Sequence, residues 1–214
     1  MAKLVKETDG FIAKHINRKV STRISTFLVK SRLDITPNEM TFLSFLTAAL
    51  SACFFLGRFP FLGGIMAQIS SILDGCDGEI ARLTNRTSKE GEILDAVLDR
   101  FADGLLIMSI TILAYNIVSF PIMGGSLIIA LGFLALMGSF SVSYSAAKGL
   151  SVGYEYKRRW AGRDIRLFVI MLAGISAEIF PLSLPLFLFI LVILTFSETI
   201  YRIKETFNKN FDSP

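Results

Sequence analysis

The chain has 214 residues, of which 52% are hydrophobic and only 19% are charged, and its mean hydropathy is +0.57. An ordinary soluble domain of this length is less apolar, so the composition favours a polytopic membrane protein. The net charge of +4 is less informative than the positions of the charges along the chain. The two cysteines, Cys53 and Cys76, both lie in apolar segments, which argues against a disulfide framework and against a zinc site.

Residues 1–35 have the pattern of an amphipathic helix. The positions of its predicted apolar face recur at spacings of three and four, with lysines and arginines between them: Phe11, Ile12, His15, Ile16, Val20, Ile24, Phe27 and Leu28. A helix of this kind lies in the membrane interface, with its apolar face in lipid and its cations near anionic headgroups. The same pattern suits a helix packed on the cytoplasmic ends of a bundle, and the two positions are compatible. We therefore expect a juxtamembrane helix before the first span.

Six apolar stretches follow, each close to the roughly 20 residues that a helix needs to cross a bilayer. They run approximately from Met40 to Leu56, Pro60 to Ile80, Ile93 to Val118, Pro121 to Ala147, Leu167 to Phe180, and Leu184 to Tyr201. The connections are short, and no internal repeat or low-complexity linker divides the chain. We predict a single all-α membrane domain over residues 1–214, with a bundle of six transmembrane helices over residues 40–203.

Lysines and arginines gather on one side of the predicted bundle. Eight precede Met40, three lie between the second and third stretches and six lie between the fourth and fifth, whereas the three opposite loops contain only Arg58. By the positive-inside rule, both termini and the two basic loops are cytoplasmic. We expect an integral protein of the cytoplasmic (plasma) membrane.

Four aspartates stand in the second and third stretches: Asp74, Asp77, Asp95 and Asp99. The first two are three residues apart and the last two are four apart, so each pair shares one face of a helix. The connection from Leu83 to Glu92 is short, and we therefore expect the two helices to be antiparallel neighbours. The four carboxylates would then converge near the cytoplasmic membrane surface.

Four carboxylates at close range repel one another, and a divalent cation removes the repulsion. Their hard oxygen atoms suit Mg²⁺, Mn²⁺ or Ca²⁺ rather than Zn²⁺, which prefers histidine or cysteine. Salt bridges to Arg82, Arg86 and Arg100 are the alternative explanation. Such salt bridges do not explain four acids in apolar segments, because each acid there costs free energy. The sequence therefore predicts a metal site, with Mg²⁺ as the expected ion and Mn²⁺ as the second choice.

The aspartates belong to a longer pattern, D-x2-D-G-x2-A-R-x8-G-x3-D-x3-D, and residues 74–99 fill all of its fixed positions. This pattern resembles the signature of the CDP-alcohol phosphotransferases. The expected juxtamembrane helix and six spans fit that family, and the run from Ile35 to Asn38 is similar to its entry into the first span. The resemblance implies that Asp74, Asp77 and Asp95 hold the metal ions that bind the donor diphosphate.

The same resemblance implies that Asp99, also at the metal site, is the general base that takes the proton from the acceptor hydroxyl while CMP leaves. The residues that it implies for binding the CDP moiety are Asp74, Asp77, Gly78, Ala81, Arg82 and Gly91. Small residues let a ligand approach the backbone closely, although close packing of membrane helices explains them as well. Asp103, one turn beyond the pattern, is a candidate for holding water or another site residue.

Basic residues near the ends of the later spans suggest an anion site. Lys148, Arg163, Arg166 and Arg202 exceed what topology requires, and guanidinium groups match phosphate oxygens well. Contact with lipid headgroups is the alternative explanation. The three arginines resemble those that bind inositol phosphate in phosphatidylinositol-phosphate synthases, whereas the sequence around Lys148 departs from that branch. We expect the four residues to bind the phosphate of a phosphorylated acceptor.

Two donors remain open for an inositol 1-phosphate acceptor. One is CDP-inositol, which leads to phosphorylated di-inositol phosphate, and the other is a CDP-lipid, which leads to a phosphatidyl- or archaetidylinositol phosphate. The runs Asp9–Ser21 and Leu73–Arg82 resemble the first branch more closely, so CDP-inositol is the favoured donor. In that branch the domain is often fused behind a cytidylyltransferase, so we expect this chain to be a stand-alone form or an excised domain.

Other functions are compatible with parts of the pattern. A cation transporter would use intramembrane acids as an ion path, but it predicts acids near the bilayer midplane. A non-catalytic membrane scaffold would use the glycines for helix pairing and would have no purpose for the acids. The family resemblance also implies a homodimer, for which the apolar third and fourth spans offer a surface. Membrane lipids are expected partners, and nucleic acid is not.

Overall fold

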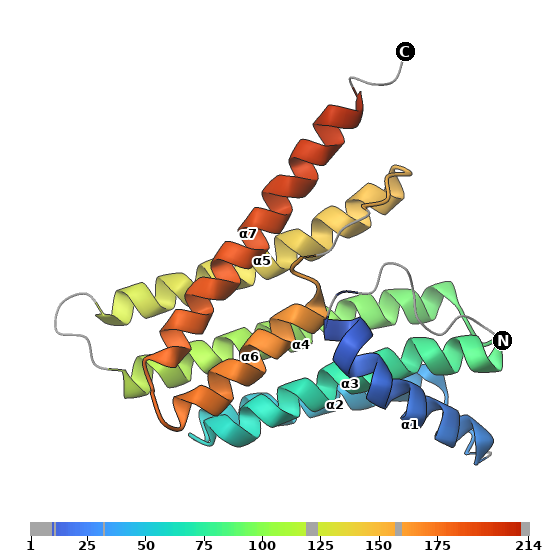
Figure 1. Ribbon diagram of the computed structural model, residues 1–214, viewed down its shortest axis with the longest axis horizontal. Coiled ribbons are helices and arrows are strands. Elements are labelled where there is room, and N and C mark those ends of the chain that lie inside the picture. The colour runs from blue at the N-terminus through green and yellow to red at the C-terminus, as the bar shows by residue number, and fades with distance from the viewer. Residues whose placement is uncertain (1–9, 11, 32, 119–123, 157–159, 211–214) are drawn as a thin grey trace.

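The computed structural model describes residues 10, 12–31, 33–118, 124–156 and 160–210. This part of the chain is helical and contains no strand (Figure 1). A π-helical turn, η1, comes first, and seven α-helices follow. The bounds are Ala13–Asn17 for η1, Arg18–Lys30 for α1, Pro37–Leu56 for α2, Pro60–Thr84 for α3, Lys89–Ile117 for α4, Gly124–Ser151 for α5, Arg163–Ala177 for α6 and Ser183–Asn210 for α7.

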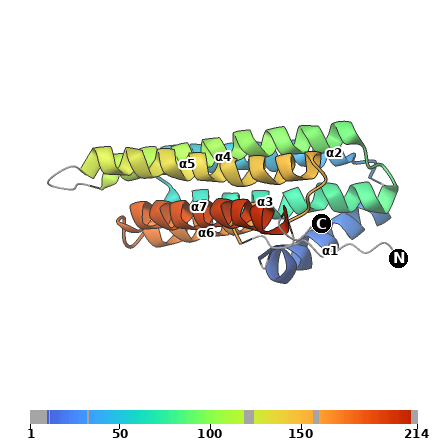
Figure 2. The same ribbon diagram turned by 90° about the horizontal axis from the view of Figure 1, so that it is seen from above.

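The long helices form two layers. Figure 2 shows α2, α4 and α5 in one layer and α3, α6 and α7 in the other, with α1 at the edge. Fully buried side chains such as Leu106, Leu167 and Leu188 fill the space between the layers. Close packing of such side chains stabilises the bundle through many small dispersion contacts.

Each predicted apolar stretch overlaps one helix, from α2 to α7, although the fifth stretch extends past the end of α6 and the first three residues of the fourth lie outside the described residues. Among the described residues, three helices are long and apolar enough to cross a membrane, namely α2, α5 and the part of α7 from Ser183 to Asn208. Helix α6 has 15 residues, fewer than the roughly 20 of a full span. The number of six spans therefore stays a prediction.

Local signals place the turns next to the aspartates. Thr36 and Glu39 form a capping box at the start of α2, with Pro37 in the first turn. Asn85 ends α3 in a left-handed conformation with φ at 54°, which asparagine tolerates better than most residues. The side chain of Ser88 then caps α4 by accepting a hydrogen bond from the Gly91 amide at 3.0 Å. Only four residues thus connect the two helices that carry the acids.

The prediction that α3 and α4 are antiparallel is correct in direction (Figure 1), but they are not packed neighbours. Helix α2 packs against both of them, and α3 packs instead against α6. The short turn sets the distance between the end of α3 and the start of α4. The packing of α2 against both helices sets the distance between their axes. This arrangement leaves room between the acid-bearing ends of α3 and α4.

The N-terminal helix crosses α3 (Figure 1). Residues 33–36 are not helical, so the helix ends before the predicted residue 35, and Phe11 lies outside the described residues. Asn17, Ser21 and Ser25 are buried, and Ile24 and Leu28 pack against a buried apolar cluster, whereas Ile16, Val20 and Phe27 are exposed. The predicted apolar face is therefore divided between the bundle and the exposed side of the helix. The position of the helix at a membrane surface stays a prediction.

Two glycines allow α3 and α6 to pack closely. A Cβ atom added to Gly174 would lie 2.4 Å from the carbonyl oxygen of Pro60, and one added to Gly64 would lie 2.7 Å from that of Met171. In both cases the neighbouring atom belongs to the backbone, which cannot move aside as a flexible side chain can. The close approach packs the start of α3 against the second half of α6, away from the end of α3 that carries the aspartates.

Gly174→Ala is therefore expected to lower the melting temperature by several degrees, although alanine itself favours helix more than glycine does. The matched control is Gly104→Ala on α4, where the new Cβ would meet only Leu136 Cδ1, at 4.0 Å. Thermal unfolding in detergent, followed by tryptophan fluorescence or aggregation, measures both variants. Equal melting temperatures for the two variants would contradict the close packing.

Candidate functional site

All four predicted aspartates line one pocket of about 560 Å³ at the α3–α4 turn end of the bundle. Its walls come from η1, α1 and the starts of α2, α4 and α6, together with the end of α3. Gly162, Arg163 and Asp164 line it next to the N-terminal segment, where the Ala13 amide donates to Asp164. Six helical elements therefore contribute to this polar cavity.

Three of the aspartates are arranged to share a cation. Asp74, Asp95 and Asp99 each offer a carboxylate oxygen, and these atoms lie within 4.8 Å of one another. Asp95 Oδ1 is buried and has no hydrogen-bond partner in the described part of the chain, which is costly unless a ligand or ion completes it. An all-oxygen donor set with such an incomplete atom fits a hard divalent cation such as Mg²⁺ or Mn²⁺.

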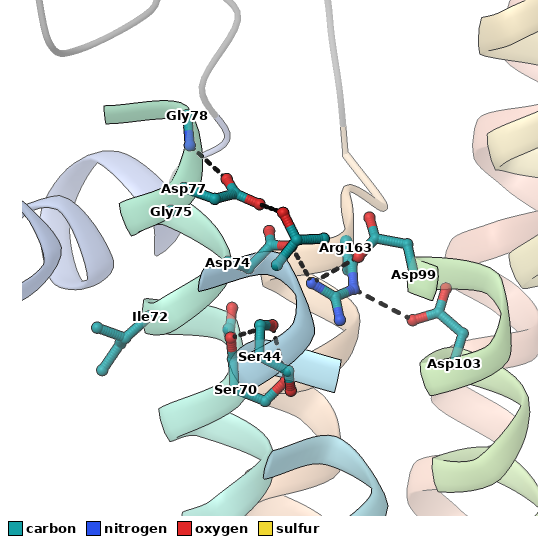
Figure 3. Close-up of polar contacts among 12 residues, drawn as sticks. Ser44, Ser70, Ile72, Asp74, Gly75, Asp77, Gly78, Asp99, Asp103 and Arg163 are labelled. Carbon is teal, nitrogen blue, oxygen red and sulfur yellow. Dashed lines mark hydrogen bonds and ion pairs between the residues drawn. The ribbon is translucent and has the colours of Figure 1, made fainter. Parts of the chain in front are cut away.

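Asp77 is held slightly apart from these three by hydrogen bonds. Its Oδ2 accepts a hydrogen bond from Thr41 Oγ1 on α2 at 2.7 Å, and its Oδ1 accepts one from the amide of Gly78 (Figure 3). Two donors on one buried carboxylate fix its orientation toward the pocket. Thr41 is a site residue that the sequence did not reveal, because a threonine in an apolar helix is ordinary.

Arg163, at the start of α6, reaches into the aspartate cluster. Its NH1 atom contacts Asp74 Oδ1 and lies 2.9 Å from Asp99 Oδ1, and its Nε lies 3.7 Å from Asp103 Oδ1 (Figure 3). The side chain is largely buried, so the ion pairs are only weakly screened by water. Of the four cations predicted to bind the acceptor phosphate, Arg163 is the one that lines the pocket.

Asp103 anchors two arginines of α6. Its Oδ2 lies 2.6 Å from Arg166 NH2 and accepts a hydrogen bond from Ser139 Oγ at 3.0 Å. Arg166 NH1 also donates to the carbonyl of Ala161 at 2.8 Å. Arg166 is buried and does not line the pocket, so its predicted contact with an acceptor phosphate stays a prediction.

The other two predicted cations lie farther away. Arg202 on α7 is buried, with its Nε 2.8 Å from Glu198 Oε1 and its NH1 2.5 Å from the carbonyl oxygen of Val142. Lys148 is exposed in the last turn of α5. Neither lines the pocket that holds the aspartates. The structure thus does not gather the four predicted cations, and the role of these two stays a prediction.

The small residues and Arg82 of the pattern line the same pocket. Gly78, Ala81, Arg82 and Gly91 are all at its wall, together with Asn38. A Cβ atom on Gly91 would lie 3.1 Å from both Asn38 Oδ1 and Ser88 Oγ, and one on Gly78 would lie 3.2 Å from Arg82 NH1. These glycines therefore keep the wall open where the starts of α2 and α4 meet the end of α3.

The N-terminal segment forms a wall that the sequence reasoning missed. Asn17 and Arg18 line the pocket, and Asp164 of α6 accepts a hydrogen bond from the Ala13 amide at 2.8 Å. The sequence pattern predicted a helix at the membrane surface or packed on the cytoplasmic ends of the bundle, but not a wall of this pocket. The available signal is the row of Asn17, Ser21 and Ser25 at a spacing of four.

Comparisons with known proteins agree with this geometry. The pattern of the CDP-alcohol phosphatidyltransferase family matches residues 34–201. A "bifunctional IPC transferase and DIPP synthase" of Thermococcus kodakarensis is 43% identical over 172 residues, which cover 77% of this chain and 37% of that protein. The chain thus spans little more than a third of that relative. An "archaetidylinositol phosphate synthase" of Pyrococcus horikoshii is 30% identical over 181 residues, which cover 81% of this chain and 86% of that one.

Solved structures show the same fold. The phosphatidylinositol phosphate synthase of Mycobacterium tuberculosis, crystallised with CDP-DAG bound, superposes with a TM-score of 0.71 over 87% of this chain and 92% of that chain, at 22% identity. The same enzyme in complex with manganese and citrate gives a TM-score of 0.68 at 24% identity, over 86% of this chain and 88% of that one. The likeness at this level of identity concerns the fold.

Thr41→Val is expected to weaken Mn²⁺ binding by about tenfold, because it removes the hydroxyl that orients Asp77. Electron paramagnetic resonance of free Mn²⁺ measures the affinity without any turnover. Thr47→Val is the control on the same helix, since Thr47 Oγ1 donates only to the carbonyl of Leu43 in its own helix, at 2.7 Å. Equal Mn²⁺ affinities of the two variants would contradict the role of Thr41.

Proposed function

Because the chain belongs to the CDP-alcohol phosphatidyltransferase family, we propose that it transfers a phospho-alcohol from a CDP-alcohol to a hydroxyl of inositol 1-phosphate and releases CMP. The observation that carries the proposal is the convergence of Asp74, Asp95 and Asp99 with Arg163 in one pocket. Such a pocket offers a metal-binding acid cluster, a base and a phosphate-binding cation side by side. These are the parts that a phosphoryl-group transfer requires.

The four aspartates, Asp74, Asp77, Asp95 and Asp99, would hold the metal. When bound, Mg²⁺ or Mn²⁺ neutralises the donor diphosphate and favours departure of CMP. Thr41 keeps Asp77 turned toward the pocket. Arg82, on the same wall as Gly78 and Gly91, is placed to contact the diphosphate, and the small residues leave space for the cytidine.

Asp99 is the proposed general base. It accepts the proton of the acceptor hydroxyl as the hydroxyl oxygen bonds to the phosphorus that carries the alcohol. The bond from that phosphorus to the bridging oxygen breaks, and CMP leaves with the electron pair of that bond. Arg163 lies 2.9 Å from Asp99 and is the proposed ligand of the acceptor phosphate. Lys148, Arg166 and Arg202 would join it only if the walls of the pocket rearranged.

Two CDP-alcohols remain candidates, and we favour CDP-inositol. The relatives named "IPC transferase and DIPP synthase" are 38 to 43% identical to this chain, whereas those named "archaetidylinositol phosphate synthase" are 28 to 30% identical. The greater similarity to the first group supports a soluble donor. The second group supports the alternative, in which a CDP-lipid is the donor.

The same proposal places the protein in the cytoplasmic membrane as six spans, with both termini and the pocket on the cytoplasmic side. The exposed apolar side chains of Ile16, Val20 and Phe27 support contact of α1 with the membrane surface. Phe101 on α4 and Phe133 on α5 are each 62% exposed. They support lipid contact or the proposed homodimer through these two helices.

A donor assay distinguishes the candidates. Purified protein with Mg²⁺ and inositol 1-phosphate is expected to release CMP from CDP-inositol and not from a CDP-lipid. Release from the CDP-lipid alone would establish the alternative donor. No CMP from either donor, together with cation flux in reconstituted vesicles, would replace the enzyme proposal by a transporter.

Asp99→Asn is expected to reduce CMP release at least about 100-fold, because asparagine cannot accept the proton. Donor binding is expected to persist, since Asp74 and Asp77 remain. Isothermal titration with the CDP-alcohol measures binding separately from turnover. The control is Asp164→Asn, an acid of the same pocket outside the cluster; if both variants turned over at the same rate, Asp99 would not be the base.

A further inference from the structure

Another buried acid lies close to the aspartates in the chain but is not part of their cluster. Glu79 on α3 is fully buried and follows Asp77 by two residues. Its carboxylate accepts hydrogen bonds from four side chains of α1, at distances of 2.8 to 3.0 Å: Arg18, Ser21, Thr22 and Ser25. A buried carboxylate is costly unless its charge is paired and its oxygens are satisfied. Here α1 supplies both the charge and the hydroxyl groups.

Arg18 connects this contact to the aspartates. The NH1 atom that lies 2.9 Å from Glu79 Oε1 also donates to the carbonyl of Gly75 at 3.0 Å. Gly75 directly follows Asp74, and a Cβ atom there would lie 3.3 Å from both Arg18 NH1 and Ser21 Oγ. Helix α1 is therefore bound to α3 on both sides of the residues that carry Asp74 and Asp77.

A second polar contact lies one turn earlier on α3. Asn17 Nδ2 donates to Ser71 Oγ at 2.8 Å, and Gln68 Nε2 donates to Asn17 Oδ1 at 2.7 Å. The interface between α1 and α3 thus contains a row of buried hydrogen bonds, beside the packing of Ile24, Leu28 and Val29 against the cluster that includes Cys76 and Ile80. Removal of the Glu79 charge would cost the largely buried Arg18 its ion pair with that carboxylate.

We propose that Glu79 is a positioning residue that holds α1 against α3 and thereby sets the affinity for the CDP-alcohol donor. Asn17 and Arg18 line the pocket, so a shift of α1 opens the donor wall. Glu79 itself faces α1, which distinguishes it from the metal-binding acids. The effect on donor affinity rests on the proposed function, whereas the effect on the position of α1 does not.

Cys76 offers a probe of α1 that needs no turnover. It is fully buried beneath this helix, with its Sγ 3.6 Å from the carbonyl oxygen of Ser21. Cys53 is exposed, so a Cys53→Ser background leaves Cys76 as the single thiol. In that background, Glu79→Gln is expected to speed alkylation of Cys76 by N-ethylmaleimide at least about tenfold. The reason is that α1 moves away from Cys76 more easily once one charge-assisted hydrogen bond is lost.

Kinetics test the link to the donor. Glu79→Gln is expected to raise the KM for CDP-inositol about tenfold while kcat stays within about threefold, because it weakens binding and leaves the reacting groups in place. Glu79→Asp keeps the charge with a shorter reach and is expected to restore part of both readouts. Mn²⁺ affinity is expected to stay at the wild-type value, since the metal-binding acids are unchanged.

Glu198→Gln is the matched control, because Glu198 is also buried and paired with an arginine, but on α7. It is expected to change neither Cys76 labelling nor the donor KM. Equal labelling of Cys76 in the two variants would overturn the anchoring of α1. Faster labelling with an unchanged donor KM would overturn the effect on the donor. A wild-type protein without CMP release would instead contradict the proposed function, and the labelling result would still decide whether Glu79 holds α1.

Discussion

A carboxylate inside an apolar helix bundle must have a cation beside it, because an unpaired charge there is costly. The protein meets this constraint in two ways. Asp103 with Arg166, Glu79 with Arg18, and Glu198 with Arg202 are buried pairs between permanent partners. The aspartate cluster pairs with Arg163 and, through Asp99 Oδ2 at 3.4 Å, with Arg100, and three of its carboxylates remain close enough to share an ion. The pairs of Asp103 with Arg166 and of Glu79 with Arg18 join different helices, whereas the pair of Glu198 with Arg202 lies within α7.

The permanent pairs also explain how the pocket keeps its shape. The pair of Asp103 with Arg166 joins α4 to the start of α6, which places Arg163 opposite the aspartates. The contacts of Glu79 join α1 to α3, and the glycines at 64 and 174 bring α6 onto the other side of α3. Since α2 packs against both α3 and α4, it holds apart the two helices that a short turn connects. Together these contacts hold the helix ends apart, and the cavity lies between them.

The sequence predicted the helices and the acids well, because both depend on local patterns. Six apolar stretches became six helices, and the spacing of Asp74, Asp77, Asp95 and Asp99 placed them on one pocket. The sequence did not predict contacts that depend on packing between distant segments. The separation of α3 from α4 depends on α2, and the support of Asp77 by Thr41 depends on a contact 36 residues away. Arg202 does not line the pocket with Arg163 and pairs with Glu198 within α7, and its contact with an acceptor phosphate stays a prediction.

The contact of Arg163 with Asp99 gives a physical reason for a phosphorylated acceptor under the proposed function. The guanidinium lies 2.9 Å from the carboxylate, so Asp99 is paired with Arg163 before an acceptor binds. A phosphate carries more negative charge than a carboxylate and matches the guanidinium fork, so it competes well for Arg163. Binding of the acceptor phosphate would then release Asp99 at the moment when a hydroxyl of the same molecule is nearby. An alcohol without a phosphate would leave the base paired with Arg163, so the proposed function predicts a preference for phosphorylated acceptors.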